Sequence, residues 1–112
     1  MNIEFLMIDY LNNNLTVPAF GEVPKNKPQS FVVIEKTGGG ERDRIRSATL
    51  AIQSYAPTMA EAARLNDTVI EVMRGAIGLQ EICACRLNSD YNFTDTAQKQ
   101  YRYQAVYNVY YY

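Results

Sequence analysis

The sequence TMAEAARLNDTVIEVMR at residues 58–74 predicts the one long helix of the chain. Thr58, followed three residues later by Glu61, fits a capping box, in which a hydroxyl and a carboxylate satisfy free N–H groups at the helix start. Apolar side chains then recur at steps of three and four residues, so they share one helical face: Ala62, Leu65, Val69 and Met73. Gly75 is expected to end the helix in a left-handed conformation. Such a helix needs an apolar surface to cover.

Strand-like segments on both sides of this helix can supply that surface. Residues 31–36 are rich in β-branched side chains, and residues 42–56 alternate between apolar and polar in their second half. Between them, residues 37–41 hold three consecutive glycines, which favour a flexible hairpin tip. A phosphate-binding loop is disfavoured because no lysine and Ser/Thr follow the glycines. After the helix, residues 77–87 and 100–111 predict two more strands, the last with its tyrosines mostly on one face.

The first thirty residues add a helix and a short extended segment. Asn2 is a good cap for an amphipathic helix that runs to about Asn13. Residues 15–20 contain a proline, which confines them to an edge strand or an arm, and residues 21–30 form a proline-containing loop. The expected fold is therefore α+β in one domain over residues 1–112. An antiparallel sheet of about four strands carries the long helix across one face, with an N-terminal helix and a hairpin arm.

Composition argues against several classes of function. The chain has 112 residues, a net charge of −1 and no histidine, so both backbone binding of nucleic acid and common acid–base catalysis are disfavoured. Cys83 and Cys85 are expected to be small buried side chains rather than metal ligands. We therefore expect no enzyme, no cofactor and no metal, although a carboxylate pair assembled by the fold stays open.

The sequence also bears on membranes and targeting. No apolar run approaches the ~20 residues that span a bilayer. The first residues lack the basic charge of a signal peptide, so a cytoplasmic protein without a membrane partner is expected.

Charged residues gather at the predicted hairpin tip. Alternation in a single strand places Arg42, Arg44 and Arg46 on one face, close to Glu41 and Asp43. Two interpretations stay open for this stripe: a solvated strand face, or a contact surface for an acidic partner.

Several short segments follow one another in an order that is more specific than any one of them. They are the Val17-Pro18 arm, FVVIEKTGGG at 31–40 with a charged tip at 41–43, the strand 50–56, the helix core EAARL at 61–65, YNFTD at 91–95 and RYQAVY at 102–107. This order resembles the small tail-terminator (tail-completion) proteins of long-tailed bacteriophages and prophages, over nearly the whole chain. Head–tail connectors and other minor tail or adaptor proteins share much of the pattern and are the alternative.

The resemblance implies an α+β subunit that assembles into a ring, typically a hexamer, without catalysis or cofactor. Such a ring caps the tail tube, stops its polymerisation and offers a surface to head–tail connector proteins, while DNA passes through it. It implies a place at the head-proximal end of the virion tail, after assembly in the cytoplasm of the bacterial host. A single-stranded nucleic-acid-binding module is the remote alternative, because tyrosines on a sheet can stack bases.

Two segments are candidates for the contacts that such an assembly needs. The charged hairpin tip is a plausible arm for docking onto the tube. The tyrosine-rich end of the last strand suits a subunit boundary, because tyrosine has an apolar body and a polar tip. The candidate assembly contacts are Glu41, Arg42, Asp43, Arg44, Arg46, Tyr110 and Tyr111.

Overall fold

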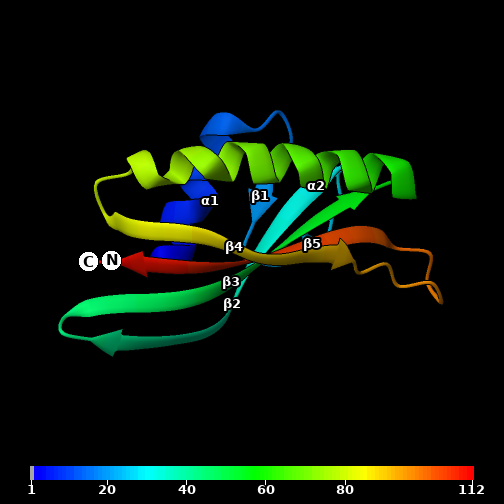
Figure 1. The fold of residues 1–112 in the computed structure, drawn as a ribbon. Helices are drawn as coiled ribbons and strands as arrows, with labels where there is room; N and C mark the ends of the chain where they lie inside the picture. Colours follow the sequence, from blue (N-terminus) through cyan, green and yellow to red (C-terminus); the bar gives the residue numbers. More distant parts are fainter. Residues whose placement is uncertain (1) are drawn as a thin grey trace.

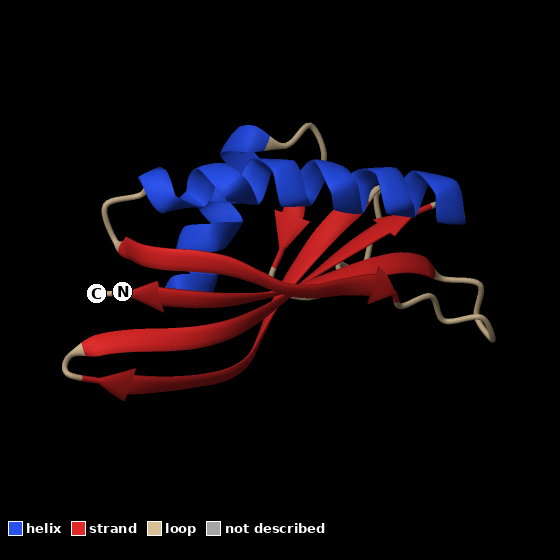
Figure 2. Ribbon diagram, in the orientation of Figure 1, coloured by secondary structure: helices blue, strands red, loops and turns tan. Residues whose placement is uncertain are grey.

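A single twisted sheet of five strands carries both helices on the same face in the computed structural model, which describes residues 2–112 (Figures 1 and 2). In chain order the elements are α1 (Ile3–Asn14), β1 (Ala19–Phe20), β2 (Phe31–Arg42), β3 (Ile45–Ala56), α2 (Met59–Met73), the 3₁₀ helix η1 (Arg74–Gly78), β4 (Ile82–Asn92) and β5 (Tyr101–Tyr111). The predicted α+β class, with one long helix on a sheet, an N-terminal helix and a hairpin arm, is confirmed.

The strands lie in the order β1-β2-β3-β5-β4. All neighbours are antiparallel except β1 and β2, which pair in parallel through Ala19 with Val32 and Phe20 with Val33. The sheet therefore has five strands and one parallel pair, where about four antiparallel strands were expected. The reason is the long connection at 21–30, which allows the chain to return and run in the same direction; a tight turn forces an antiparallel partner.

Both helices begin where their caps predict. The Asn2 side chain accepts a hydrogen bond from the Phe5 N–H at 3.1 Å, and the Thr58 hydroxyl accepts one from the Glu61 N–H at 3.2 Å. These bonds satisfy donors that have no partner within a helix. The helices predicted over residues 2–13 and 58–74 are therefore present as α1 over Ile3–Asn14 and α2 over Met59–Met73, with Asn2 and Thr58 as their extended N-caps.

α2 ends just before Gly75, as expected, but the left-handed conformation predicted for Gly75 is wrong. None of the glycines has a positive φ, and the chain tightens into η1 after Met73. Gly75 has a different role, because a Cβ at this position would lie 2.6 Å from the Tyr10 hydroxyl oxygen. That hydroxyl donates a hydrogen bond to the Val72 carbonyl at 2.6 Å, so the glycine lets α1 approach the end of α2.

The main core lies between the helices and one face of the sheet. Ala62, Val69 and Met73 of α2 are buried as the helical pattern predicts, while Leu65 is half-buried at the edge. α2 packs on β3 and β5, and α1 packs on β1 and β2. The other buried members of this core are Ile3, Met7, Leu11, Ala19, Val32, Ile34, Ala48, Leu50, Ile52, Ala76, Ile82, Ala105, Tyr107, Val109 and Tyr111.

The strand after α2 begins later than expected. β4 covers residues 82–92 rather than 77–87, because η1 takes up the start of that segment. The register shifts between Ile82 and Ala84, so a bulge at Cys83 breaks the simple alternation. Cys85 packs against the core and both cysteines are half-buried, not fully buried as expected. The last strand, β5, occupies its predicted position.

Candidate functional site

The outer halves of β2 and β3, residues 35–49, form a projecting hairpin that we call the distal arm. It extends past the helices, and its turn is the outermost part of that end of the molecule (Figure 1). All side chains from residue 37 to residue 45 are exposed, whereas residues 31–34 of the same hairpin are buried. The distal arm therefore has main-chain pairing with little side-chain burial.

The predicted position of the hairpin tip is wrong. Gly38, Gly39 and Gly40 lie inside β2 and pair with Thr49, Ala48 and Ser47. The turn consists of Asp43 and Arg44, whose φ angles are 51° and 65°. A two-residue hairpin turn with positive φ at both positions matches the right-handed twist of its strands, which explains why the chain reverses here although neither residue is glycine.

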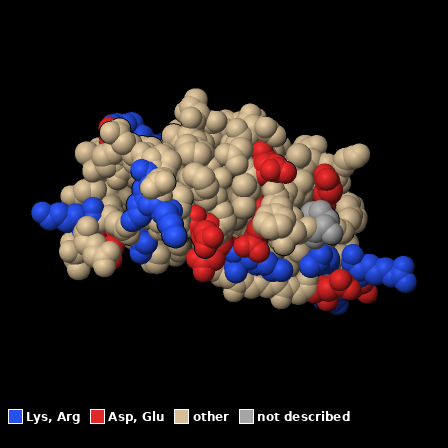
Figure 3. All heavy atoms as spheres, turned by 180° about the vertical axis from the view of Figure 1, so that it is seen from behind, with Lys and Arg blue, Asp and Glu red and all other residues tan. Residues whose placement is uncertain are grey.

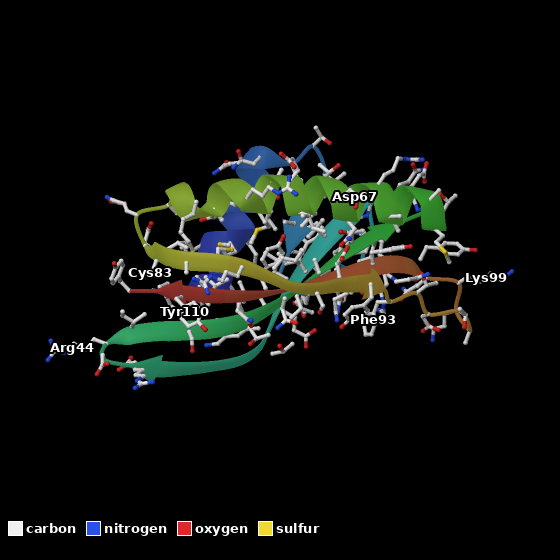
Figure 4. All side chains as sticks on the ribbon, in the orientation of Figure 1. Arg44, Asp67, Cys83, Phe93, Lys99 and Tyr110 are labelled. Atoms are coloured by element: carbon white, nitrogen blue, oxygen red, sulfur yellow. The ribbon has the colours of Figure 1, made fainter. Side chains whose placement is uncertain are left out.

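The three arginines do not form one stripe. Because the turn lies at 43–44, Arg42 belongs to β2 and Arg46 to β3, and Arg42 pairs with Ile45 while Glu41 pairs with Arg46. Residues that pair directly share a face, and neighbours along a strand alternate, so Arg42 and Arg46 lie on opposite faces. Arg44 sits at the end of the turn, far from Lys99 at the other end of the molecule (Figure 4).

Arg46 and Tyr111 form a contact on the helix-covered face. The Arg46 guanidinium carbon lies 5.1 Å from the centroid of the Tyr111 ring, and the Tyr111 side chain is fully buried. A cation over an aromatic ring is attracted by the ring's negative face. Tyr111 is a member of the main core, so its prediction as an assembly contact is wrong for the side chain.

The tyrosine-rich strand, which was predicted to lie at a subunit boundary, is an inner strand of the sheet. β5 lies between β3 and β4. Alternation along it puts Tyr110 on the helix-free face, where 42% of its surface is exposed. Of the two predicted tyrosines, only Tyr110 offers its ring to a partner.

Two neighbouring hollows mark the helix-free face of the distal arm. The larger has a volume of about 450 Å³ and the smaller about 220 Å³, and they share Ser47 and Tyr110. Glu41, Arg42, Asp43 and Ile45 are the other residues at the larger hollow, although Glu41, as the partner of Arg46, directs its side chain to the opposite face. Exposed apolar groups of Ile45 and Tyr110 lie here beside charges of both signs, so this face offers a partner both apolar and charged contacts.

On the other half of the helix-free face, side chains form a hydrogen-bonded network that the sequence pattern did not predict. Gln53 donates to Gln104 at 2.9 Å, and Gln104 donates to the Tyr91 hydroxyl at 2.6 Å, which leaves both amides almost buried. Each of these polar residues alone resembles an ordinary solvent-facing position. Only the strand order shows that they form one row across β3, β5 and β4.

An aromatic row lies beside these amides. The Phe31 and Tyr55 rings stack at 4.6 Å, and the Arg102 guanidinium carbon lies 4.6 Å from the centroid of the Phe93 ring, whose place in the fold Figure 4 shows. Arg102 also donates to the Tyr55 hydroxyl at 3.0 Å. Phe31 and Tyr55 are thus engaged within the chain and are not open platforms on which bases can stack.

Three further properties bear on possible partners: the distribution of surface charge, the grouping of metal-binding side chains and the hydrophobicity of the helices. Lys and Arg are interspersed with Asp and Glu over the face seen in Figure 3, without a continuous basic surface. Across residues 2–112, no three His, Cys, Asp or Glu side chains gather as a metal site would require. Neither helix in this part of the chain has the length and hydrophobicity needed to cross a bilayer.

Cys85 and two tyrosines that it influences, Tyr10 and Tyr107, have raised pKa values. Burial raises the pKa of the Cys85 thiol to about 11 and the pKa of the Tyr107 phenol to about 12. Burial also raises the pKa of Tyr10, with a further contribution from Cys85. A thiol that keeps its proton at neutral pH is a weak nucleophile, so this cysteine does not have the properties of a reactive centre.

Comparison with protein-family models gave no match for this chain, and comparison with curated proteins gave no similar sequence.

Proposed function

We propose that this chain is a structural protein of a phage or prophage virion, a tail terminator whose ring caps the tail tube. The observation that carries the proposal is the distal arm, which extends an ordered hairpin from the packed domain while burying few side chains. A strand pair that adds little to the core is well suited to hold a surface out to a partner. The order of segments, which resembles tail terminators, supports the same conclusion.

In this proposal the helix-free face of the distal arm docks onto the tail tube protein. Arg42 and Tyr110 line the same hollow as Ile45, so the face combines a cation with exposed apolar groups. Copies of the subunit form a ring, typically a hexamer, that stops tube polymerisation and presents a surface to head–tail connector proteins. The subunit performs no catalysis and needs no cofactor, and DNA only passes through the ring at the head-proximal end of the tail.

A tube-capping assay with charge-reversed variants tests this proposal. Arg42→Glu together with Arg44→Glu changes the distal arm, and Lys25→Glu together with Lys27→Glu makes the same change of charge in the exposed loop before β2. Arg46 stays unchanged because it packs on Tyr111. Tube length is measured by negative-stain microscopy after tail tube protein polymerises with each variant.

We expect the unmodified chain and the loop variant to limit tube growth at substoichiometric amounts. The arm variant should keep its circular dichroism spectrum, because both arginines are exposed, and should lose most of its capping. Full capping by the arm variant would show that the distal arm is not the docking surface. Tubes that grow equally with and without the unmodified chain would count against the terminator function and favour a connector or adaptor.

A further inference from the structure

Two strands of the sheet have outer edges without a partner in residues 2–112. β1 pairs only with Val32 and Val33, and the Lys36 N–H donates to the Glu4 carboxylate at 3.4 Å. Beyond Lys36 the outer edge of β2 faces no strand of the described chain. β4 is the last strand on the other side and pairs only with β5. Such edges carry rows of unpaired N–H and C=O groups that can template another strand.

The register shows which groups of β2 point outward. The two-residue turn closes on the pair Arg42 and Ile45, and the pair that flanks such a turn is hydrogen-bonded. Hydrogen-bonded and non-bonded pairs alternate along an antiparallel ladder. The pairs of Glu41 with Arg46 and of Gly39 with Ala48 are therefore non-bonded, so Glu41 and Gly39 direct their backbone groups to the open edge.

The same reasoning applies to β4. The Phe93 N–H donates to the Arg102 carbonyl at 2.9 Å, which makes the even-numbered residues of β5 the bonded ones on this side. Asp90 and Leu87 pair with odd-numbered residues, Ala105 and Tyr107, so their backbone groups point outward. Leu87 also has 43% of its surface exposed, which leaves an apolar side chain at this edge.

Three consecutive glycines, Gly38, Gly39 and Gly40, lie in the part of β2 that has an open edge, and crowding inside the chain explains only Gly39. None has a positive φ, so no turn requires them. A Cβ at Gly38 or Gly40 would meet no atom closer than 3.4 Å, so crowding inside the chain does not require these two either. A glycine inside a strand weakens it, and it often marks a bulge or a place where another backbone approaches closely. The register shift between Lys36 and Gly38 accounts for the glycine next to it, whereas Gly40 lies in regular pairing with Ser47 and leaves room for a backbone from outside the described chain.

The directions of β2 and β4 allow a second copy of this chain to pair with the open edge of β2. β2 is antiparallel to β3, β3 to β5, and β5 to β4, so β2 and β4 run in opposite directions. A copy in the same orientation beside the first would place its β4 antiparallel to β2. The two edges are different patches on opposite sides of the sheet, which is what a closed head-to-tail ring requires.

We propose that the outer edge of β2 at residues 37–42 pairs with the outer edge of β4 in a second copy, so that the sheet continues from subunit to subunit. This inference rests on the proposed self-assembly and adds the surface that performs it. Main-chain bonds supply the contact, and the glycines keep side chains out of its way.

Two proline variants, each with a matched control, test this pairing. Glu41→Pro removes one outward N–H from β2, and Leu87→Pro removes one from β4; proline is tolerated where the N–H faces away from the ladder. Glu41→Ala and Leu87→Ala change the same side chains and keep the N–H groups. Molar mass is measured by light scattering at increasing protein concentration.

We expect the unmodified chain and both alanine variants to assemble, and each proline variant alone to stay a monomer of 12.7 kDa or slightly less. An equal mixture of the two proline variants should give a 1:1 dimer and nothing larger, because one intact β2 edge meets one intact β4 edge. Assembly by either proline variant alone would overturn the inference. So would an unmodified chain that stays monomeric at every concentration.

Hydrogen exchange on the unmodified chain answers the same question without a mutation that can disturb folding. Assembly should slow exchange at the Gly39, Glu41, Leu87 and Asp90 amides, while Gly40 is already protected by β3 in the monomer. Unchanged exchange at those four amides in an assembled sample would overturn the edge pairing. If both proline variants still form rings, the edge pairing is wrong but the proposed terminator function is not contradicted. If the unmodified chain instead forms open chains through these edges, the result counts against a ring that caps the tube.

Discussion

The two ends of the β2–β3 hairpin share one ladder of main-chain pairs but differ in how far their side chains are buried. At the base, Ile34 pairs with Ile52 and both are fully buried under the helices. In the distal arm, Arg42 pairs with Ile45 and both are exposed. Backbone pairing thus continues well beyond the point where apolar burial stabilises the fold. This difference separates a base that carries stability from an arm that is free to make contacts.

The largest effect should come from truncating an isoleucine at the base. Ile34→Ala or Ile52→Ala removes a fully buried side chain and leaves a cavity, so each should lower the free energy of unfolding by about 2–5 kcal/mol. The matched control is Ile45→Ala in the distal arm, where 40% of the residue is exposed and the loss should be about 0.5 kcal/mol. Urea denaturation of the three variants measures the difference. Equal losses at base and arm would remove the distinction.

The turn of the distal arm can be made more stable than it is. Arg44 has a φ of 65°, a region where a side chain costs energy and glycine does not. Arg44→Gly should therefore raise the free energy of unfolding by about 1 kcal/mol. Arg42→Gly, two residues away in an ordinary strand position, should lower it by about 0.5–1 kcal/mol. Thermal denaturation with opposite shifts of the midpoint would confirm the position of the turn.

Two neighbouring glycines in the arm should respond differently to a methyl group. A Cβ at Gly38 would find its nearest atom at 3.9 Å, so Gly38→Ala should stabilise the isolated subunit by about 0.5 kcal/mol. At Gly39 a Cβ would lie 2.8 Å from the Lys36 side chain and 3.0 Å from the Ser47 carbonyl oxygen, so Gly39→Ala should give no gain or a loss. Chemical denaturation at a concentration where the chain is monomeric compares them. A gain at Gly39 that equals the gain at Gly38 would mean that the arm is loosely packed.

High pH should lower the free energy of unfolding, because the partly buried thiol of Cys85 resists ionisation in the folded chain. Burial raises the pKa of its thiol from 9.0 to about 11, so the unfolded chain ionises first as pH rises. The stabilising contribution is complete below pH 9 and is lost progressively between pH 9 and about pH 11. Unfolding monitored at several pH values should show this loss, and Cys85→Ala should make it shallower. An identical slope in the two proteins would show that other groups, such as Tyr107 with a pKa of about 12, cause the loss.

Local chemistry was enough to predict much of the fold. The helix caps at Asn2 and Thr58 depend on side-chain bonds to residues only three positions away, so a short sequence window contains them. The alternation of β5 is likewise a property of one strand. The pattern predicts the turn at the wrong place because glycines are the usual residues of tight turns. The actual turn at 43–44 contains an aspartate and an arginine with positive φ, and arginine rarely adopts positive φ.

The candidate site depended more on tertiary structure. Arg42 and Arg46 seemed to share a face as long as they were assigned to one strand, and the turn between them put them on opposite faces. Asn66 lies on the buried side of α2 and donates to the Asp90 carboxylate at 3.0 Å, a partner 24 residues away on β4. Neither relation is contained in a local pattern, because each depends on which strands become neighbours.

The sequence by itself determined the α+β class, both helix starts, the apolar face of α2 and the course of the last strand, since periodicity and capping act over a few residues. Only the tertiary structure decided that β5 lies inside the sheet, that Tyr111 is buried under Arg46, and that β2 and β4 have open edges. Strand order sets which main-chain groups find partners within the chain, and order is a product of long-range packing. The surfaces available for assembly follow from that order.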